Sequence, residues 1–520
     1  MSKKIDIELL GQSDTPGGDS LYVSERKVYP RDVSGRFDRL RKAAGFWLLG
    51  MYYLFPWLQW DGRQAVLFDL PARKFHVFGL TFWPQDFSLL AVLLVILALL
   101  LFFVTALAGR LWCGYACPQT VWTEVFLWME RWTEGDRARR MKLDAGPWTR
   151  EKVLRKGAKH ALWLVFALWT GFTFVGFFTP IVDLAARAWP YGWNGWEVFW
   201  VLFYALATWG NAGFLREQVC KYMCPYARFQ SAMFDRDTLV IAYDPMRGEP
   251  RGPRKRGLGS VLERARGLLD VRTAYDYVFR ASRHPSAAQA RIQAAGTITF
   301  DTGAEAPPLP KFAFEELGDC IDCTVCVQVC PVGIDILNGL QYECISCGAC
   351  IDACDTVMEK MGYPTGPIRY STQNAIDGKP TRIVRPRIIV YGLLLLGLCS
   401  GWAWGVGNRS PLIAEALRDR NALFQERADG SVENGYTLKI INKTVEPRRY
   451  RIAVEAGSGI ALRDGERVVE AAPEEVLELP VVLSSSDGVR GKQSVVFTVT
   501  TLGADGASER VPSTFFGPLK

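Results

Sequence analysis

Eight cysteines between residues 320 and 354 are the strongest chemical signal in this chain of 520 residues. They form two runs of the type C-x2-C-x2-C-x3-C, and each cysteine recurs after 24 residues, which indicates a duplicated metal-binding unit. The spacing is that of bacterial ferredoxins, in which the fourth cysteine of each run binds the other cluster. The first predicted ligand set is therefore Cys320, Cys323, Cys326 and Cys354, and the second is Cys344, Cys347, Cys350 and Cys330.

The spacing predicts two [4Fe–4S] clusters. Three cysteines placed two residues apart can hold three corners of one cubane, and Pro331 turns the chain out of the site directly after Cys330. Structural zinc sites usually pair C-x2-C units across a longer gap, and the cysteines are too crowded for an ordinary disulfide framework. The unit is therefore predicted to conduct single electrons.

Two further cysteine pairs share the form C-x3-C-P, namely Cys113 with Cys117 and Cys220 with Cys224, and each follows an apolar segment. Residues four apart share one face of a helical turn, so each pair can present two sulfurs together. Thiolates favour Cu(I) and zinc over hard cations. The alternative is that these cysteines are small packing residues at helix ends. The duplication favours a metal or redox site, whereas Cys399 lies inside an apolar run and is predicted to be buried without a role.

The composition predicts a multidomain membrane protein. Hydrophobic residues make up 49% of the chain, and 18 tryptophans suggest aromatic belts at a membrane surface. Clear membrane helices are predicted at 87–109, 161–181, 198–215 and 388–407, and a shorter aromatic stretch at 43–60 is counted as the first span. The three histidines and the absence of C-x-x-C-H give no support for haem attachment.

The distribution of cations predicts the orientation. The loop 110–159 holds eleven Lys or Arg, whereas the connections 61–86 and 182–197 hold four between them. The positive-inside rule then places the N-terminus, the 110–159 loop and the 216–387 segment in the cytoplasm. Five spans would leave the C-terminal domain in the periplasm. No apolar signal-peptide core occurs before residue 43.

The C-terminal part changes to short alternating runs around residues 436–443, 450–455, 475–483 and 494–501, which predict a small antiparallel β-sandwich without catalytic residues. The basic stretch before the cluster unit is interpreted as a solvated loop. The predicted domains are a cytoplasmic segment 1–42, a membrane domain 43–225 with four helices and both C-x3-C-P motifs, a basic connection 226–311, a double-cluster ferredoxin domain 312–370, a fifth membrane helix 388–407 and a periplasmic immunoglobulin-like domain 408–520.

The chain resembles the CcoG/FixG/RdxA family of cytochrome c oxidase accessory proteins. The resemblance is carried by GDCIDCTVCVQVCPVGIDI, GLQYECISCGACIDACD, CGYACPQTVWTE and CKYMCPYARFQ, and it extends over nearly the whole chain in domain order. It implies a helical membrane bundle with an inserted ferredoxin domain and an immunoglobulin-like C-terminal domain. The segment 257–310 is longer than is usual in the family.

The resemblance also implies a function: a cupric reductase of the bacterial inner membrane that turns Cu(II) into Cu(I) for assembly of cbb3-type cytochrome oxidase. Its implied partners are the lipid bilayer, copper ions, a copper chaperone or copper-transporting ATPase, the oxidase subunits and an unidentified electron donor, and nucleic acid is not among them. The copper-binding and catalytic residues carried over are Cys113, Cys117, Cys220 and Cys224.

Two other functions are compatible with the same motifs. One is a membrane polyferredoxin that takes electrons from quinol, since such proteins carry similar C-x3-C-P pairs. The other is a copper chaperone or assembly scaffold whose clusters serve only structure. The β-sandwich favours the oxidase accessory family over the first, and an assay of Cu(II) reduction separates both from the main interpretation.

Overall fold

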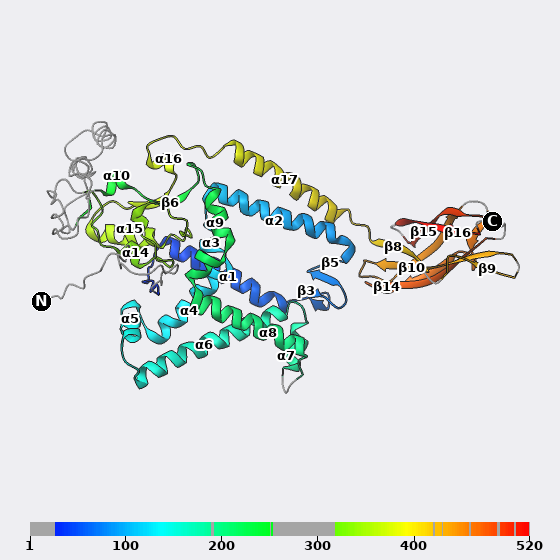
Figure 1. The fold of residues 1–520 in the computed structure, drawn as a ribbon, viewed down its shortest axis with the longest axis horizontal. Helices are drawn as coiled ribbons and strands as arrows, with labels where there is room; N and C mark the ends of the chain where they lie inside the picture. Colours follow the sequence, from blue (N-terminus) through cyan, green and yellow to red (C-terminus); the bar gives the residue numbers. More distant parts are fainter. Residues whose placement is uncertain are drawn as a thin grey trace, which may run out of the picture. The chain divides into compact units, whose positions relative to one another are not determined.

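A computed structural model describes residues 27–188, 192–249, 251–252, 318–419, 422–428, 430–456, 459–485, 489–503 and 506–518. Most of the predicted segment 1–42, nearly all of the connection 226–311 beyond residue 252 and the long segment 257–310 lie outside these residues. The chain divides into two compact units, which are described separately: residues 1–57 with 101–389, and residues 58–100 with 390–520. Figure 1 shows both units and labels their helices and strands where there is room.

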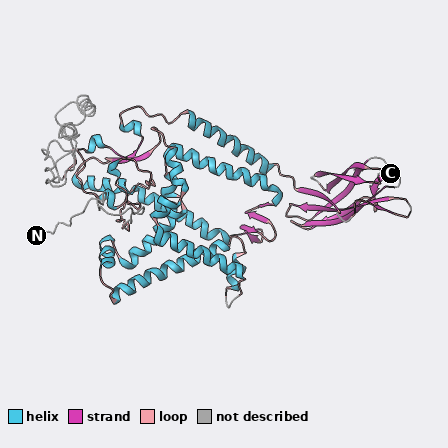
Figure 2. Ribbon diagram, in the orientation of Figure 1, coloured by secondary structure: helices cyan, strands magenta, loops and turns pink. Residues whose placement is uncertain are grey.

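The first unit is mainly helical (Figure 2). Its membrane-associated part contains α1 (Arg36–Leu54), η1 (Phe55–Trp57), the end of α2 (Phe87–Ala108), α3 (Leu111–Tyr115), α4 (Pro118–Glu134), α5 (Arg137–Ala145), α6 (Arg150–Val175), α7 (Ile181–Arg187), α8 (Gly195–Thr208), the π-helices η3 (Trp209–Leu215) and η4 (Val219–Met223), and α9 (Pro225–Ala232). Helix α6 packs closely on α8 at Gly171. A side chain larger than hydrogen at this position would collide with the Val201 carbonyl, so glycine allows the close approach.

Four helices in the described residues are long and apolar enough to cross a membrane: Pro84–Ala108, Arg150–Val175, Gly195–Leu215 and Pro386–Gly407, the last being α17. Their cores coincide with four of the five predicted spans. The second of them begins well before the predicted residue 161, because the cationic turns that the sequence assigned to a loop continue the same helix.

The predicted span 43–60 is not one of these four helices. Helix α1 already begins at Arg36, and its first two turns carry four cationic residues. The uncharged part from Ala43 to Leu54 is about 18 Å long at 1.5 Å per residue, which is less than the ~30 Å of a hydrocarbon core. The segment is therefore not among the helices that length and composition identify as spans, and a fifth crossing at α1 stays a prediction.

The ferredoxin part contains α14 (Val325–Gln328), η6 (Ile336–Asn338) and α15 (Ala349–Met361). An antiparallel pair, β6 (Val240–Tyr243) with β7 (Ile368–Ser371), closes it, flanked by the short helices α10 (Pro245–Gly248) and α16 (Gln373–Ile376). Ile241, Ile336, Ile351 and Ile368 are buried together with Cys326 in its core. Strand β6 lies in the stretch predicted as a basic connection, so that stretch contributes directly to the cluster fold.

The N-terminal helix is attached to the ferredoxin part. The backbone amides of Phe37 and Asp38 donate to the carboxylate of Asp352 on α15 at 3.1 and 2.7 Å. A carboxylate that accepts the free amides at a helix N-terminus stabilises that terminus. Gly348 has no side chain, which lets Phe37 approach the loop that precedes α15.

The second unit contains the predicted sandwich, which is confirmed. One sheet has the order β12-β14-β10-β8, with β9 paired to β10, and the other has the order β13-β11-β15-β16; all pairs are antiparallel. The strands are β8 (Leu412–Arg418), β9 (Gln425–Glu426), β10 (Val432–Asn442), β11 (Arg448–Ala456), β12 (Ile460–Leu462), β13 (Arg467–Ala471), β14 (Val476–Ser485), β15 (Lys492–Leu502) and β16 (Ser508–Phe516). Alternate residues such as Leu438, Ile440 and Phe497 are buried between the sheets.

A small strand-rich segment before α2 belongs to the same unit. It contains β1 (Gln59–Trp60), β2 (Arg63–Gln64), β3 (Val66–Asp69), β4 (Lys74–Val77), β5 (Leu80–Phe82) and η2 (Pro84–Asp86). The carboxylate of Glu474, in the sandwich, accepts from Arg63 at 2.5 Å and from Thr81 at 2.7 Å. Asp86 pairs with Lys443 at 2.9 Å. The segment between the first two helices is thus bound to the sandwich.

Candidate electron-transfer site

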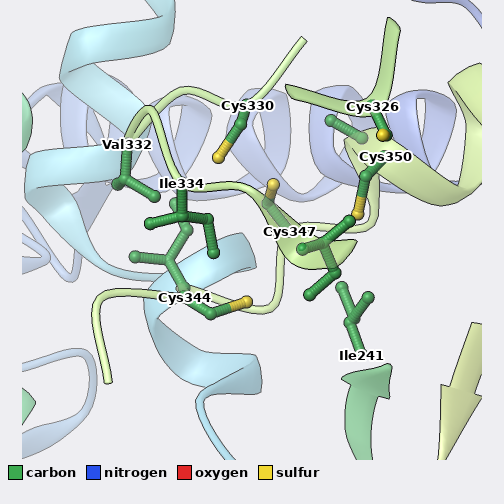
Figure 3. A pocket seen from close by; sticks show the side chains of 11 residues that line it. Ile241, Cys326, Cys330, Val332, Ile334, Cys344, Cys347 and Cys350 are labelled. Atoms are coloured by element: carbon green, nitrogen blue, oxygen red, sulfur yellow. The ribbon is translucent and has the colours of Figure 1, made fainter. Parts of the chain in front are cut away.

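The second predicted ligand set converges on one cavity. Cys330, Cys344, Cys347 and Cys350 turn their sulfurs toward a shared space (Figure 3). Aliphatic side chains, among them Val332, Ile334 and Ile345, form the rest of its wall. Cys330 comes from the first run and the other three from the second run, which is the exchange of the fourth cysteine that the spacing predicts.

The first predicted set is also brought together. Cys354 lies on α15, and its thiol is close enough to those of Cys320, Cys323 and Cys326 for their charges to raise its pKa. Cys323 is exposed and Cys326 is buried, so this set reaches from the surface into the core. The two sets meet at Cys326 and Cys350, since Cys326 also lines the cavity of the second set.

The chemistry of these thiols fits iron–sulfur clusters. Burial raises the pKa of Cys326 and Cys330 to about 12 and that of Cys344 to about 11, so the free thiols are neutral and iron must displace their protons. Among the described residues, no three His, Cys, Asp or Glu side chains are close enough to bind a single metal ion. A cubane binds each cysteine through a different iron and separates its ligands more widely, so the grouping suits clusters rather than mononuclear zinc.

The first C-x3-C-P motif is a turn between two helices. Cys113 is buried in α3, and Cys117 is the extended residue directly before α4, whose first residue is Pro118. Proline suits this first helical position because its missing N–H would have no partner inside the helix. The hydroxyl of Thr120 donates to the Cys113 carbonyl at 2.6 Å and fixes the turn.

The second motif also ends at a proline that begins a helix, but its first cysteine lies in a π-helix. Cys220 lies in the π-helix η4, Cys224 ends it, and Pro225 begins α9. Arg216, between the two π-helices, has φ 40° and ψ −111°, a conformation that costs free energy unless neighbouring contacts hold it. Its guanidinium donates to Glu130 at 2.9 Å, and its carbonyl accepts from Gln119 at 3.2 Å. These bonds connect the second motif to α4, which begins after the first.

The four C-x3-C-P thiols are mutual neighbours. Burial raises the pKa of Cys220 to about 12, with further contributions from Cys117, Cys113 and Cys224. Burial likewise raises the pKa of Cys113, against the opposing effect of Arg110. The two motifs therefore present their sulfurs to one another, although 103 residues separate Cys117 from Cys220 in the sequence. No three of them are spaced as ligands of one ion in the described structure.

Cys113 also touches the loop of the second ligand set. A Cβ atom at Gly114 would lie 2.7 Å from the Ile345 carbonyl oxygen and 3.0 Å from the Cys347 Cα, so only glycine allows this approach. Arg110 donates to the Tyr342 carbonyl and lies with one nitrogen 3.9 Å from the Cys113 sulfur. The Cys113 thiol donates to Gln230 at 3.3 Å. The first C-x3-C-P motif thus packs directly against the ferredoxin part.

Sequence reasoning missed the buried charges around this site. Arg110, Arg140 and Lys159 were counted among the cations of the cytoplasmic 110–159 loop, yet each is less than 5% exposed. Glu130, which is fully buried, pairs with Arg140 at 3.2 Å and with Arg216 at 2.9 Å. Arg140 lies ten residues from Glu130, beyond the reach of a helical turn, and Arg216 lies 86 residues away, so no local pattern revealed the cluster.

Cys399 corrects another prediction. It is exposed on α17 rather than buried, because that helix buries none of its residues within the protein and an apolar span faces lipid. It lies outside both cysteine groupings and offers a matched control for variants at Cys113, Cys117, Cys220 and Cys224.

Comparison with known proteins identifies the family. The chain is 35% identical to the nitrogen fixation protein FixG of Rhizobium meliloti (strain 1021), over 93% of this chain and 91% of that protein. The chain belongs to the FixG/RdxA family. It is also 36% identical to protein RdxB of Cereibacter sphaeroides, over 89% of this chain and 87% of that protein. Protein RdxA of the same organism is 36% identical over 85% of this chain and 84% of its own length.

Domain families match the separate parts of this FixG relative. The IG-like fold at the C-terminal of FixG matches residues 402–518, and a 4Fe-4S dicluster domain matches residues 215–266 and 309–373. A 4Fe-4S binding domain matches residues 90–135. A crystal structure of a FixG-related protein from Vibrio parahaemolyticus is 31% identical over 21% of this chain and 98% of that chain, with a TM-score of 0.19.

The fold class and the family predicted from the sequence are therefore confirmed. The FixG-family chain is a membrane-associated iron–sulfur protein of the electron-transferring oxidoreductase type, with a ferredoxin part and an immunoglobulin-like sandwich. Both C-x3-C-P motifs lie inside segments matched by 4Fe-4S families, which connects these motifs to the iron–sulfur machinery.

Proposed function

We propose that the chain reduces Cu(II) to Cu(I) at the four C-x3-C-P cysteines, for assembly of a cbb3-type cytochrome oxidase. The observation that carries the proposal is the contact between Cys113 and the ferredoxin part. A group of soft thiols and the loop that holds Cys344 and Cys347 meet at Gly114. The proposed cluster ligands are Cys320, Cys323, Cys326 and Cys354 in the first set, and Cys330, Cys344, Cys347 and Cys350 in the second.

The proposed chemistry is a one-electron step. The bound clusters supply single electrons. Each Cu(II) takes one electron and becomes Cu(I), no atom is transferred, and a low-potential one-electron donor restores the reduced protein. Cys113, Cys117, Cys220 and Cys224 receive copper and favour the product, because thiolates prefer Cu(I). Each pair of thiols can hold copper and then pass it to a partner.

A single-turnover experiment tests the proposal. The protein is reduced anaerobically, freed of excess reductant, mixed with Cu(II), and the Cu(I) formed is trapped by a chromogenic chelator. Two one-electron clusters predict about two Cu(I) per chain. A quinol-linked carrier or a scaffold with structural clusters predicts Cu(I) no higher than that produced by the same protein after the clusters are removed.

The proposed topology places the clusters in the cytoplasm and the sandwich in the periplasm of a bacterial inner membrane. The contacts of Arg63 and Thr81 with Glu474 support it, because they require the segment after α1 and the sandwich to share one side. The positive-inside rule favours a cytoplasmic position for the cationic loop 110–159, and the clusters are proposed to lie on that same side. The proposed partners are the lipid bilayer, a copper chaperone or copper-transporting ATPase and the oxidase subunits.

Reporter fusions test this topology. Fusions after residues 140 and 240 are expected to be active as cytoplasmic reporters, and a fusion after residue 430 as a periplasmic reporter. An odd number of crossings separates residue 430 from each of the other two positions. A reporter at the N-terminus, compared with a fusion after residue 70, decides whether α1 crosses the membrane. A cytoplasmic result at residue 430 would contradict the topology.

A further inference from the structure

The two ligand sets face opposite charges. Carboxylates lie near the cysteines of the first set. Asp322 is near Cys320, Asp335 near Cys326 and Asp355 near Cys354, and each negative charge raises the pKa of the neighbouring thiol. Arg251 also lies near Cys320, but it is partly exposed and lies 3.8 Å from both Glu249 and Asp322. Arg247 lies near Asp355 but pairs with Asp319 at 2.7 Å. The carboxylates therefore outnumber the cations, and this side of the ferredoxin part is negative.

The second set faces one buried and one partly buried guanidinium group. Arg110 is 2% exposed, and its charge lies near enough to Cys344 to lower the pKa of that thiol against the effect of burial. Its described contacts are the Tyr342 carbonyl and the Cys113 sulfur, and neither is a carboxylate. Its Nε atom has no hydrogen-bond partner. A buried cation without a carboxylate costs considerable desolvation free energy, so a negative group is needed to offset its charge.

Arg41 carries the second guanidinium group, which interacts electrostatically with the Cys347 thiol. It pairs with Asp38 at 3.3 Å, but Asp38 also pairs with Lys42 at 2.7 Å, so the carboxylate is shared by two cations. Asp352 is the buried carboxylate on this side, and two amides at the start of α1 already bind it. Glu124 also lies near Arg41, but it pairs with Arg131 at 3.3 Å. The cations Arg110, Arg41 and Lys42 outnumber the carboxylates Asp38 and Asp352, so the surroundings of the second set are positive.

This difference in surrounding charge changes the reduction potential of each cluster. A cluster becomes more negative when it accepts an electron, and the potential of an iron–sulfur cluster depends on its charge, its hydrogen bonds and its exposure. Nearby cations stabilise the reduced form and nearby carboxylates destabilise it, most strongly where water is excluded. We propose that Arg110 and Arg41 give the group held by Cys330, Cys344, Cys347 and Cys350 the higher potential, so that an electron shared by the two clusters rests beside Cys113.

The direction of transfer rests on the proposed function. Arg110 contacts both the loop before Cys344 and the Cys113 sulfur, and Gly114 brings Cys113 against Ile345. An electron that enters at the partly exposed first set would thus move toward the C-x3-C-P cysteines. Arg110 is a positioning residue here, because it acts on the electron through the group that the cysteines hold.

Equilibrium redox titration of the purified protein, followed by electron paramagnetic resonance, tests the proposal. Variants Cys320→Ala and Cys344→Ala assign the two signals. The second set is expected to titrate at the higher potential by at least tenfold in the equilibrium constant, which is ~59 mV for one electron. Arg110→Gln should shift that signal alone to lower potential by a similar factor, whereas Arg110→Lys should keep it near the wild-type value.

Variants on the other side keep the proposal falsifiable if Arg110→Gln does not fold. Asp355→Asn should raise the potential of the first set, and Arg41→Gln should lower that of the second. Equal potentials, the reverse order, or charge variants that move neither signal would overturn the proposal. The titration involves no copper, so protein with the expected order that yields no Cu(I) supports this inference while it contradicts the proposed function.

Discussion

Replacing Cys344 by alanine is expected to remove about half of the iron and acid-labile sulfide, from about eight of each per chain in the wild type. Cys344 belongs to the set that lines one cavity with Cys330, Cys347 and Cys350, whereas the first set is grouped around Cys354. The remaining iron should give a single [4Fe–4S] signal. Metal analysis and electron paramagnetic resonance of anaerobically purified protein measure both quantities.

The iron count also tests the role of the C-x3-C-P cysteines. Both motifs lie in segments matched by 4Fe-4S families, so a third cluster held by these thiols is the competing assignment. It predicts about twelve irons per chain and a loss of about four in Cys113→Ser with Cys117→Ser. Cys399→Ser is the matched control and should keep all the iron. Stoichiometric zinc without acid-labile sulfide would contradict the cluster assignment altogether.

Glu130→Gln is expected to lower the free energy of unfolding in detergent by about 3–5 kcal/mol. The side chain is fully buried, and it lies 2.9 Å from Arg216, 3.2 Å from Arg140 and 3.7 Å from Lys159. An amide cannot balance these cations, so the variant leaves buried positive charge unpaired. Because Glu130 also holds the strained Arg216, the position of Cys220 should loosen as well, with faster alkylation of that thiol.

The control for this variant is Glu151→Gln. Glu151 pairs with Arg155 at 2.8 Å on the surface of α6, where its side chain is 69% exposed, and the expected change is below about 1 kcal/mol. Burial would raise the pKa of Glu130, but Arg216 and the neighbouring cations hold it below its ordinary value. Its contribution to stability is therefore present above pH 4.5 and is lost as the pH falls through the lowered pKa. Equal effects of the two variants would contradict the buried network.

The sequence predicted the parts of the site whose geometry is set by local chemistry. The cysteine spacing follows from the shape of a cubane, so the exchange of Cys330 and Cys354 between the runs was expected, and the structure groups the thiols in that way. The β-sandwich was predictable because alternation along strands such as β10 reports which face is buried.

The remaining features depend on residues far apart in the chain. Arg110 resembles an ordinary cation at the end of a membrane helix, and only the packing of the Cys344 loop reveals that it is buried. Strand β6 finds its partner β7 more than 100 residues later, so the intervening composition suggested a simple connection. The charged start of α1 was assigned to the N-terminal segment before the first span, because its partner Asp352 is supplied by the ferredoxin part.

Anaerobic stopped-flow oxidation of the reduced protein by Cu(II) tests the central claim most directly. Wild type and Cys399→Ser are expected to be oxidised rapidly, with Cu(I) as the product. Cys113→Ser with Cys117→Ser, and separately Cys220→Ser with Cys224→Ser, should keep about eight irons yet react at least ~10-fold more slowly, since loss of supporting residues alone costs metal sites 10–100-fold. Unchanged rates in both double variants, with the iron content verified, would contradict the account, because copper would then be meeting the clusters without the C-x3-C-P thiols.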